Sequence, residues 1–126
     1  SRVFGDLVIN HVLPAAKRYQ KMLLEKVANV KMVFDADEAK ALNEQDCLLI
    51  RRIEAHASAI IAGVDKMTKL RVTANHIDNQ RERALSFHDN VVPIMEDIRK
   101  HVDELEMWVD DQLWTLPKYR ELLFIR

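Results

Sequence analysis

The sequence predicts an all-α fold, an antiparallel bundle of three long helices followed by a short C-terminal helix. Apolar residues recur in steps of three and four along most of the chain, as they do on one face of an amphipathic helix. Only 2 Gly and 3 Pro occur among 126 residues, too few for the turns of hairpins and phosphate-binding loops. A chain of this length suits one domain with a modest core. We therefore expect residues 1–126 to form a single helical domain.

The central stretch, residues 42–77, organises the rest of the chain. It contains no proline, and 36 helical residues would extend for about 54 Å, so they need partner helices along their length. We expect this helix to cover residues 42–76. Its apolar face is formed by Leu49, Ile53, Ala57, Ile60, Val64, Met67, Leu70, Ala74 and Ile77.

Short connections are expected on both sides of this helix. Residues 35–41 form an acidic connection, after which either Asp37 or Asn43 is the candidate N-cap. Gly63 is a small cost to the helix and suggests a close approach of another helix. Residues 75–79 are the expected turn to the next helix. Connections this short favour antiparallel neighbours.

Two further long helices are expected to flank the central one. The first covers residues 2–34, and the third covers residues 80–111. Because an internal proline removes a backbone hydrogen bond and crowds the preceding turn, kinks are predicted near Pro14 and Pro93. The apolar series are Val8, Val12, Ala15, Tyr19, Leu23, Val27 and Val30 in the first helix, and Ala84, Val91, Met95, Ile98, Val102, Leu105 and Val109 in the third.

Both ends of the chain are more apolar than a three-helix bundle requires. Residues 7–16 are apolar around most of the helix circumference, which is typical of a helix buried on all sides. Near the other end, Pro117 suits the first turn of a short helix over residues 117–124. We expect both ends to contact a surface outside this chain. The predicted interface residues are Leu7, Ile9, Val12 and Leu13, with Trp114, Pro117, Tyr119, Leu122, Leu123 and Phe124.

Charge and cysteine content narrow the function classes. The 19 basic and 20 acidic residues nearly cancel, so the overall field does not favour nucleic acid or an acidic membrane as a partner. No apolar run approaches the roughly 18 residues of a membrane span. The single cysteine, Cys47, allows no internal disulfide and fits a reducing cytosol. A cytoplasmic protein is therefore expected.

A search for catalytic chemistry finds little. A di-iron site in a helical bundle needs Glu-x-x-His motifs, and no Glu stands three residues before any histidine, namely His11, His56, His76, His88 and His101. Asp97 and His101, four residues apart, are better interpreted as a surface pair than as metal ligands. No serine or cysteine lies in a nucleophile elbow. We predict no catalytic, cofactor-binding or metal-binding residue in this chain.

Two runs of residues resemble a known family. They are NHVLPAAKRYQ, which begins at Asn10, and VDDQLWTLPKYRELLF, which begins at Val109. Both resemble the C-terminal region of type III glutamine synthetases, the large bacterial form. The second run is the more specific, because its Trp, Pro, Tyr and Leu-Leu-Phe stand at fixed offsets. Thr115 departs from the family pattern, which has Pro after Trp, and this affects the local turn only.

The resemblance implies a parent enzyme of nitrogen metabolism that joins glutamate and ammonia into glutamine. Such an enzyme uses ATP and Mg²⁺ or Mn²⁺ and works as a ring-shaped homo-oligomer. Its catalytic residues would precede this chain, so none is carried over. The chain would be a non-catalytic C-terminal helical domain that serves packing and assembly, and a start at Ser1 suits a piece of a longer protein. The alternative is a stand-alone helical adaptor that binds a partner helix through its apolar ends.

Overall fold

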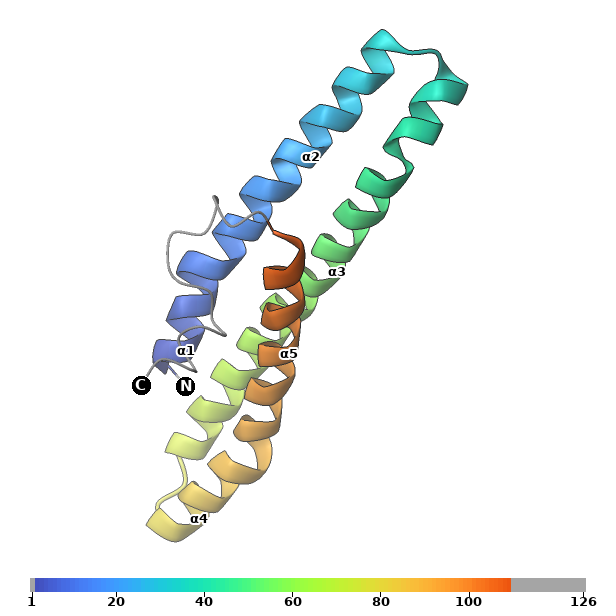
Figure 1. Cartoon of the computed structure of the whole chain (residues 1–126). Coiled ribbons are helices and arrows are strands. Elements are labelled where there is room, and N and C mark those ends of the chain that lie inside the picture. The colour runs from blue at the N-terminus through green and yellow to red at the C-terminus, as the bar shows by residue number, and fades with distance from the viewer. Residues whose placement is uncertain (1, 110–126) are drawn as a thin grey trace, which may run out of the picture.

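A computed structural model describes residues 2–109 of the chain, and every element in this range is helical (Figure 1). Three helical arms follow one another, joined by two short connections. The all-α prediction is thus confirmed for the described residues. The short helix predicted over residues 117–124 lies outside them.

The first arm consists of α1 (Arg2–Leu7), the π-helical turn η1 (Val8–Val12) and α2 (Leu13–Val33), without a break between them. The sequence predicted a kink near Pro14. The chain stays helical there with a π turn just before the proline, and the first N–H after that turn bonds to the carbonyl five residues earlier. Because π turns are among the usual sites of helix kinks, the kink stays a prediction. A turn widened by one residue accommodates the proline, which donates no hydrogen bond and crowds the turn before it.

The second arm is α3 (Ala36–Asn75), which is 40 residues long. It begins six residues before the predicted start at residue 42, because its N-cap is Asp35 and neither Asp37 nor Asn43. Asp35 has an extended backbone, and its Oδ1 accepts the N–H of Glu38 at 2.8 Å. Most of the residues expected to form an acidic connection thus belong to the beginning of α3. Negative side chains are stabilised there by the helix dipole.

The third arm consists of α4 (Gln80–Ser86), the π turn η2 (Phe87–Val91) and α5 (Val92–Trp108). As in the first arm, a π turn precedes the proline, here Pro93. The predicted end at residue 111 is too late, because the arm ends at Trp108 and the next residue has an extended backbone.

The predicted turn between the second and third arms is confirmed. Residues 76–79 are non-helical. Asn79 caps the third arm with its side chain, which accepts the N–H of Glu82 at 3.0 Å. The guanidinium of Arg83 donates to the carbonyl of Ile77 at 2.8 Å and 2.9 Å, which ties the turn to the first helical residues after it.

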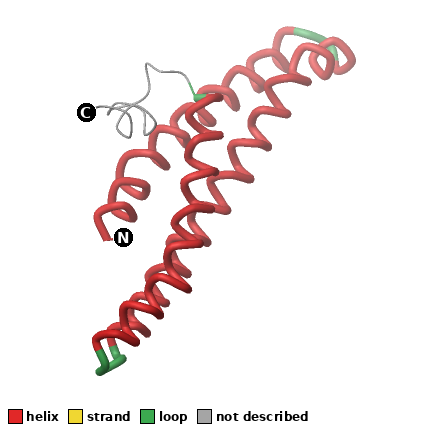
Figure 2. The backbone as a smooth tube through the Cα atoms, turned by 60° about the horizontal axis from the view of Figure 1, so that its bottom comes forward, coloured by secondary structure: helices red, strands yellow, loops and turns green. Residues whose placement is uncertain are grey.

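α3 is the central element, and the other two arms pack on it from opposite ends (Figures 1 and 2). The first arm runs antiparallel to α3 from the first connection, and the third arm runs antiparallel to it from the second. Lys26 Nζ lies 3.1 Å from Asp46 in the first pairing, whereas a Cβ on Gly63 would contact Ile98 in the second. All three arms therefore meet only around the middle of α3.

This staggered arrangement differs from the predicted bundle of three long helices in contact along their whole length. The fully buried positions of α3 are concentrated where the arms overlap, at Ile53, Ala57 and Ile60. They belong to a single cluster of buried side chains that draws on all three arms, including Val8, Val12, Ala16, Ile98, Val102 and Leu105. Among the elements of residues 2–109, α2 is the main partner of α3 toward its N-terminal end, and apolar side chains are exposed there.

α3 and α5 approach each other closely at Gly63. A Cβ at this position would lie 2.8 Å from Cγ1 and 3.2 Å from Cδ1 of Ile98, which is fully buried. The approach predicted from the sequence is thus confirmed. The glycine costs α3 some helix propensity and in return lets α5 pack closely.

Candidate functional site

Two histidines from different arms meet at the contact between α3 and α5. His56 Nδ1 lies 2.8 Å from His101 Nδ1, and the two rings are tilted by 54° with their centroids 5.1 Å apart. On the far side of the second ring, His101 Nε2 lies 3.7 Å from Asp97 Oδ2. The expected surface pair of Asp97 and His101 is thus present, but it belongs to a larger cluster that joins two arms.

The short distance constrains the protonation of this pair. One Nδ1 must carry the hydrogen and donate the hydrogen bond, and the other must be unprotonated and accept it, because two protonated nitrogens cannot hydrogen-bond to each other. The pKa of His56 is lowered from its ordinary value of 6.5 by burial and by the charge of His101, while Glu104 raises it and Arg52 lowers it. His56 is therefore held in its neutral form at neutral pH.

One turn before His56, the same face of α3 makes a second contact with the third arm. The guanidinium carbon of Arg52 lies 5.1 Å from the centroid of the Trp108 ring, within the range of a cation–π interaction. Trp108 is 36% exposed, so this contact is worth about 0.5–1 kcal/mol. Together, the histidine pair and the Arg52 contact hold the end of α5 against the middle of α3.

Polar side chains connect α2 with the N-terminal half of α3. Asn43 is buried, and its Nδ2 donates to the carbonyl of Val27 at 3.2 Å, whereas its Oδ1 has no partner. Gln20 Nε2 donates to the carbonyl of Ile50 at 3.4 Å. Lys17 Nζ lies 2.8 Å from Glu54 Oε2. Buried polar groups such as those of Asn43 and Gln20 fix the register of a helix pair at some cost in stability, whereas the Lys17–Glu54 pair is exposed.

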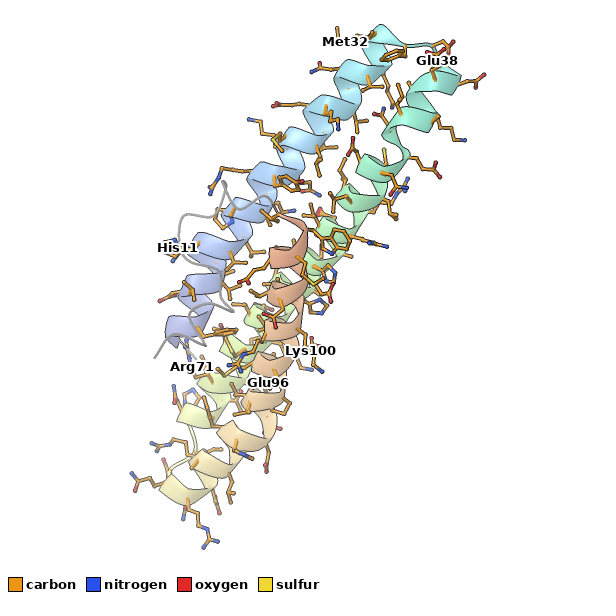
Figure 3. All side chains as sticks on the ribbon, in the orientation of Figure 1. His11, Met32, Glu38, Arg71, Glu96 and Lys100 are labelled. Atoms are coloured by element: carbon orange, nitrogen blue, oxygen red, sulfur yellow. The ribbon has the colours of Figure 1, made fainter. Side chains whose placement is uncertain are left out.

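The hairpin end, where α2 joins α3, carries an exposed apolar surface. Met32 is 83% exposed and Val33 is 75% exposed, and Figure 3 shows Met32 at the tip of the hairpin. We define this hairpin-end surface by Met22, Met32, Val33, Phe34, Leu42 and Leu48, each more than 40% exposed. Of these residues, Met22, Val33 and Phe34 line one shallow pocket together, and exposed apolar side chains that lie together mark contact sites more often than isolated ones do.

An open groove lies beside the hairpin-end surface. It has a volume of about 880 Å³ and is lined largely by α3. Cys47, which is partly buried, lies in this groove together with Lys31, Arg51 and several small residues. The small residues Ala36, Ala39 and Ala41 also line the groove.

The predicted interface residues fall into two groups. Of the first patch, Ile9 is 41% exposed and Leu7 is partly buried, whereas Val12 and Leu13 pack inside this chain. The second patch, formed by Trp114, Pro117, Tyr119, Leu122, Leu123 and Phe124, lies outside the described residues. Its role therefore stays a prediction.

Within residues 2–109, we find no group of three or more His, Cys, Asp or Glu side chains arranged to hold a metal ion. The helices in that range also include none that is both long and apolar enough to cross a membrane. What the described residues do define is a helical packing unit, with a core where three arms overlap and an open apolar hairpin end.

Sequence reasoning missed two of these features. The histidine pair joins residues 45 positions apart, and no local spacing relates His56 to His101. The hairpin-end surface had a signal in the sequence, because Met32, Val33 and Phe34 form a continuous apolar run beside a connection. Such a run lacks the spacing of an amphipathic helix, and the prediction assigned it to the end of the first helix.

The chain is similar over its full length to glutamine synthetases. It is 45% identical over all 126 residues to "Glutamine synthetase" of Bacteroides fragilis (strain YCH46). It is 27% identical over 121 residues, 96% of the chain, to "Type-3 glutamine synthetase" of Dictyostelium discoideum. The resemblance indicated by the sequence is thus confirmed. The chain spans only 17% and 16% of the lengths of these two relatives. No family model matches it.

Proposed function

We propose that this chain is a non-catalytic C-terminal helical domain of a type III glutamine synthetase, and that it serves packing and oligomer assembly. The parent enzyme would ligate ammonia to glutamate at the expense of ATP, through a glutamyl phosphate, with Mg²⁺ or Mn²⁺ as cofactor. ATP, metal ions and substrates would bind to other parts of the polypeptide. The location of such an enzyme is cytoplasmic.

The observation that carries this proposal is the extent of the similarity. A match over 100% of this chain covers only 17% of the relative, so the relative is about six times as long. Similarity that extends from end to end of the chain favours a common role for the whole domain. A domain that forms a small part of a large enzyme is expected to contact the rest of it.

The exposed apolar surfaces of the chain support a proposal for where these contacts would form. The hairpin-end surface has no partner within residues 2–109, although Met32 and Val33 are among the most exposed apolar side chains. We infer that it packs against the catalytic portion or a neighbouring subunit. Ile9, on the outer side of the first arm, would contribute to a second contact, whereas Val12 and Leu13 support it from inside. Trp114 and its neighbours up to Phe124 would form the third.

A tryptophan comparison in the full-length protein tests the proposed anchor. Trp114→Ala is expected to weaken oligomer assembly or stability by about 3–5 kcal/mol if the ring is fully buried in the interface. Trp108→Ala is the matched control, because Trp108 is 36% exposed and its contact with Arg52 is internal to this chain. Sedimentation velocity and thermal melting report assembly and stability. An oligomer and melting temperature that Trp114→Ala leaves unchanged would refute the anchor.

The stand-alone adaptor makes a different prediction about the gene. The proposed function requires an open reading frame that continues upstream of Ser1 for several hundred codons and encodes a glutamate-rich catalytic region. A start codon directly before Ser1 would instead favour an adaptor that is complete in 126 residues. Reading the upstream sequence separates the two.

A further inference from the structure

We propose that the contact between α3 and α5 is a proton-sensitive latch, in which His56 and His101 hold the third arm while they share one Nδ1 proton and release it when both rings are charged. The latch goes beyond the proposed role in assembly and does not depend on it. It rests on the pairing of two imidazoles from different arms at 2.8 Å.

The contact between the two Nδ1 atoms persists as long as one of the two rings is neutral. A neutral ring can accept the Nδ1–H of the other ring, whether or not that other ring is charged. When both rings are protonated, two N–H groups face each other and the hydrogen bond is lost. Asp97 Oδ2 lies 3.7 Å from His101 Nε2, on the side of the ring away from His56.

Charged groups on the neighbouring elements affect the protonation of His56. On α5, His101 opposes a charge on His56 and Glu104 favours it. On α3 itself, Arg52 opposes it. Between α2 and α3 at this level, Lys17 and Glu54 pair with each other at 2.8 Å. Burial is the largest of the influences that oppose a charge on His56, and the net result is a lowered pKa.

The sign of the pH effect follows from this shift. The unfolded or detached chain takes up a proton at His56 near the ordinary value of 6.5, before the latched chain does. The latch is therefore fully effective above about pH 6.5 and weakens as the pH falls below that value. The first pairing, between α2 and the N-terminal half of α3, contains no histidine among its described contacts and should be retained.

Hydrogen exchange of the 126-residue chain between pH 7.5 and pH 5 tests the latch. After correction for intrinsic rates, amides of α5 should lose protection by up to about tenfold per pH unit as the pH falls from 6.5 toward the lowered pKa of His56, while amides of the α2–α3 hairpin keep theirs. His56→Asn, which places a neutral amide near the position of Nδ1, should abolish this dependence. His88→Asn, at an exposed histidine of η2, should leave it unchanged.

Imidazole NMR of the unaltered chain provides a second measurement that does not rely on the folding of a variant. His56 should titrate below pH 6.5. The latch is refuted if α5 keeps its protection down to pH 5, if His56→Asn loses protection as the unaltered chain does, or if His56 titrates at or above pH 6.5.

Discussion

Gly63→Ala tests the close approach of α3 and α5 on which the staggered packing depends. The added Cβ would stand 2.8 Å from Cγ1 of Ile98, a separation that real Cβ contacts do not show. Ile98 is fully buried and cannot rotate away freely. Overpacking of this kind costs about 1–3 kcal/mol, whereas replacing a helical glycine by alanine gains about 0.5–1 kcal/mol. We expect a net loss of about 1 kcal/mol.

Gly5→Ala is the matched control, because it makes the same change in a helix with room to accept it. Its Cβ would meet Met67 Cε at 3.5 Å, an ordinary van der Waals contact. Since both variants gain the same helix propensity, the difference between them isolates the overpacking of about 1–3 kcal/mol.

Urea denaturation followed by far-UV circular dichroism measures this difference as a change in midpoint multiplied by the slope. A double variant, Gly63→Ala with Ile98→Ala, should recover part of the loss relative to the sum of the single changes, because the clashing atoms are gone. The reasoning is refuted if Gly63→Ala is as stable as Gly5→Ala.

Two further predictions concern polar groups. Asp35→Ala should destabilise the chain by about 0.5–2 kcal/mol, because it removes the N-cap of α3; Asp37→Ala should cost less in the same urea assay, and equal losses would argue against Asp35 as the cap. Asn43→Ala should cost about 0.5–1.5 kcal/mol through the lost hydrogen bond to Val27. Exposed Asn29→Ala should be neutral or stabilising, and thermal melting that ranks these two variants the other way would contradict the assigned contact.

The periodicity of apolar residues predicted the arms because it reports local geometry. Steps of three and four residues place side chains such as Ile53, Ala57 and Ile60 on one face, and the structure buries all three. The turn before Asn79 was predictable for a similar reason, since polar residues there interrupt the apolar series. Each of these features depends on neighbours within a few residues.

The N-cap of α3 and the backbone before Pro14 were hard to predict, because neighbouring residues allow several local structures there. Asp35, Asp37 and Asn43 are all good N-cap residues, and the choice among them is made by where α2 ends and the backbone becomes extended. Pro14 predicted a disturbed helix, because a proline removes a hydrogen bond, but the residue alone does not say which disturbance forms. In the structure a π turn, η1, precedes the proline within a continuous helix.

The stagger of the arms and the histidine pair are properties of tertiary packing. Apolar series of similar length suggest helices that overlap fully, whereas the connections determine how far each arm reaches along α3. His56 and His101 meet only because this register brings their positions to one level of the bundle. No spacing within either helix contains that information.

Oxidative footprinting of methionines is the most direct test of the central proposal, that this chain packs against the rest of a glutamine synthetase. Met32 is 83% exposed and Met67 is 2% exposed in this chain, so peroxide should oxidise the first much faster than the second when the chain is isolated. In the intact full-length protein, Met32 should become protected while Met67 stays protected. Oxidation of Met32 at the same rate in both would contradict packing of the hairpin end against the rest of the enzyme.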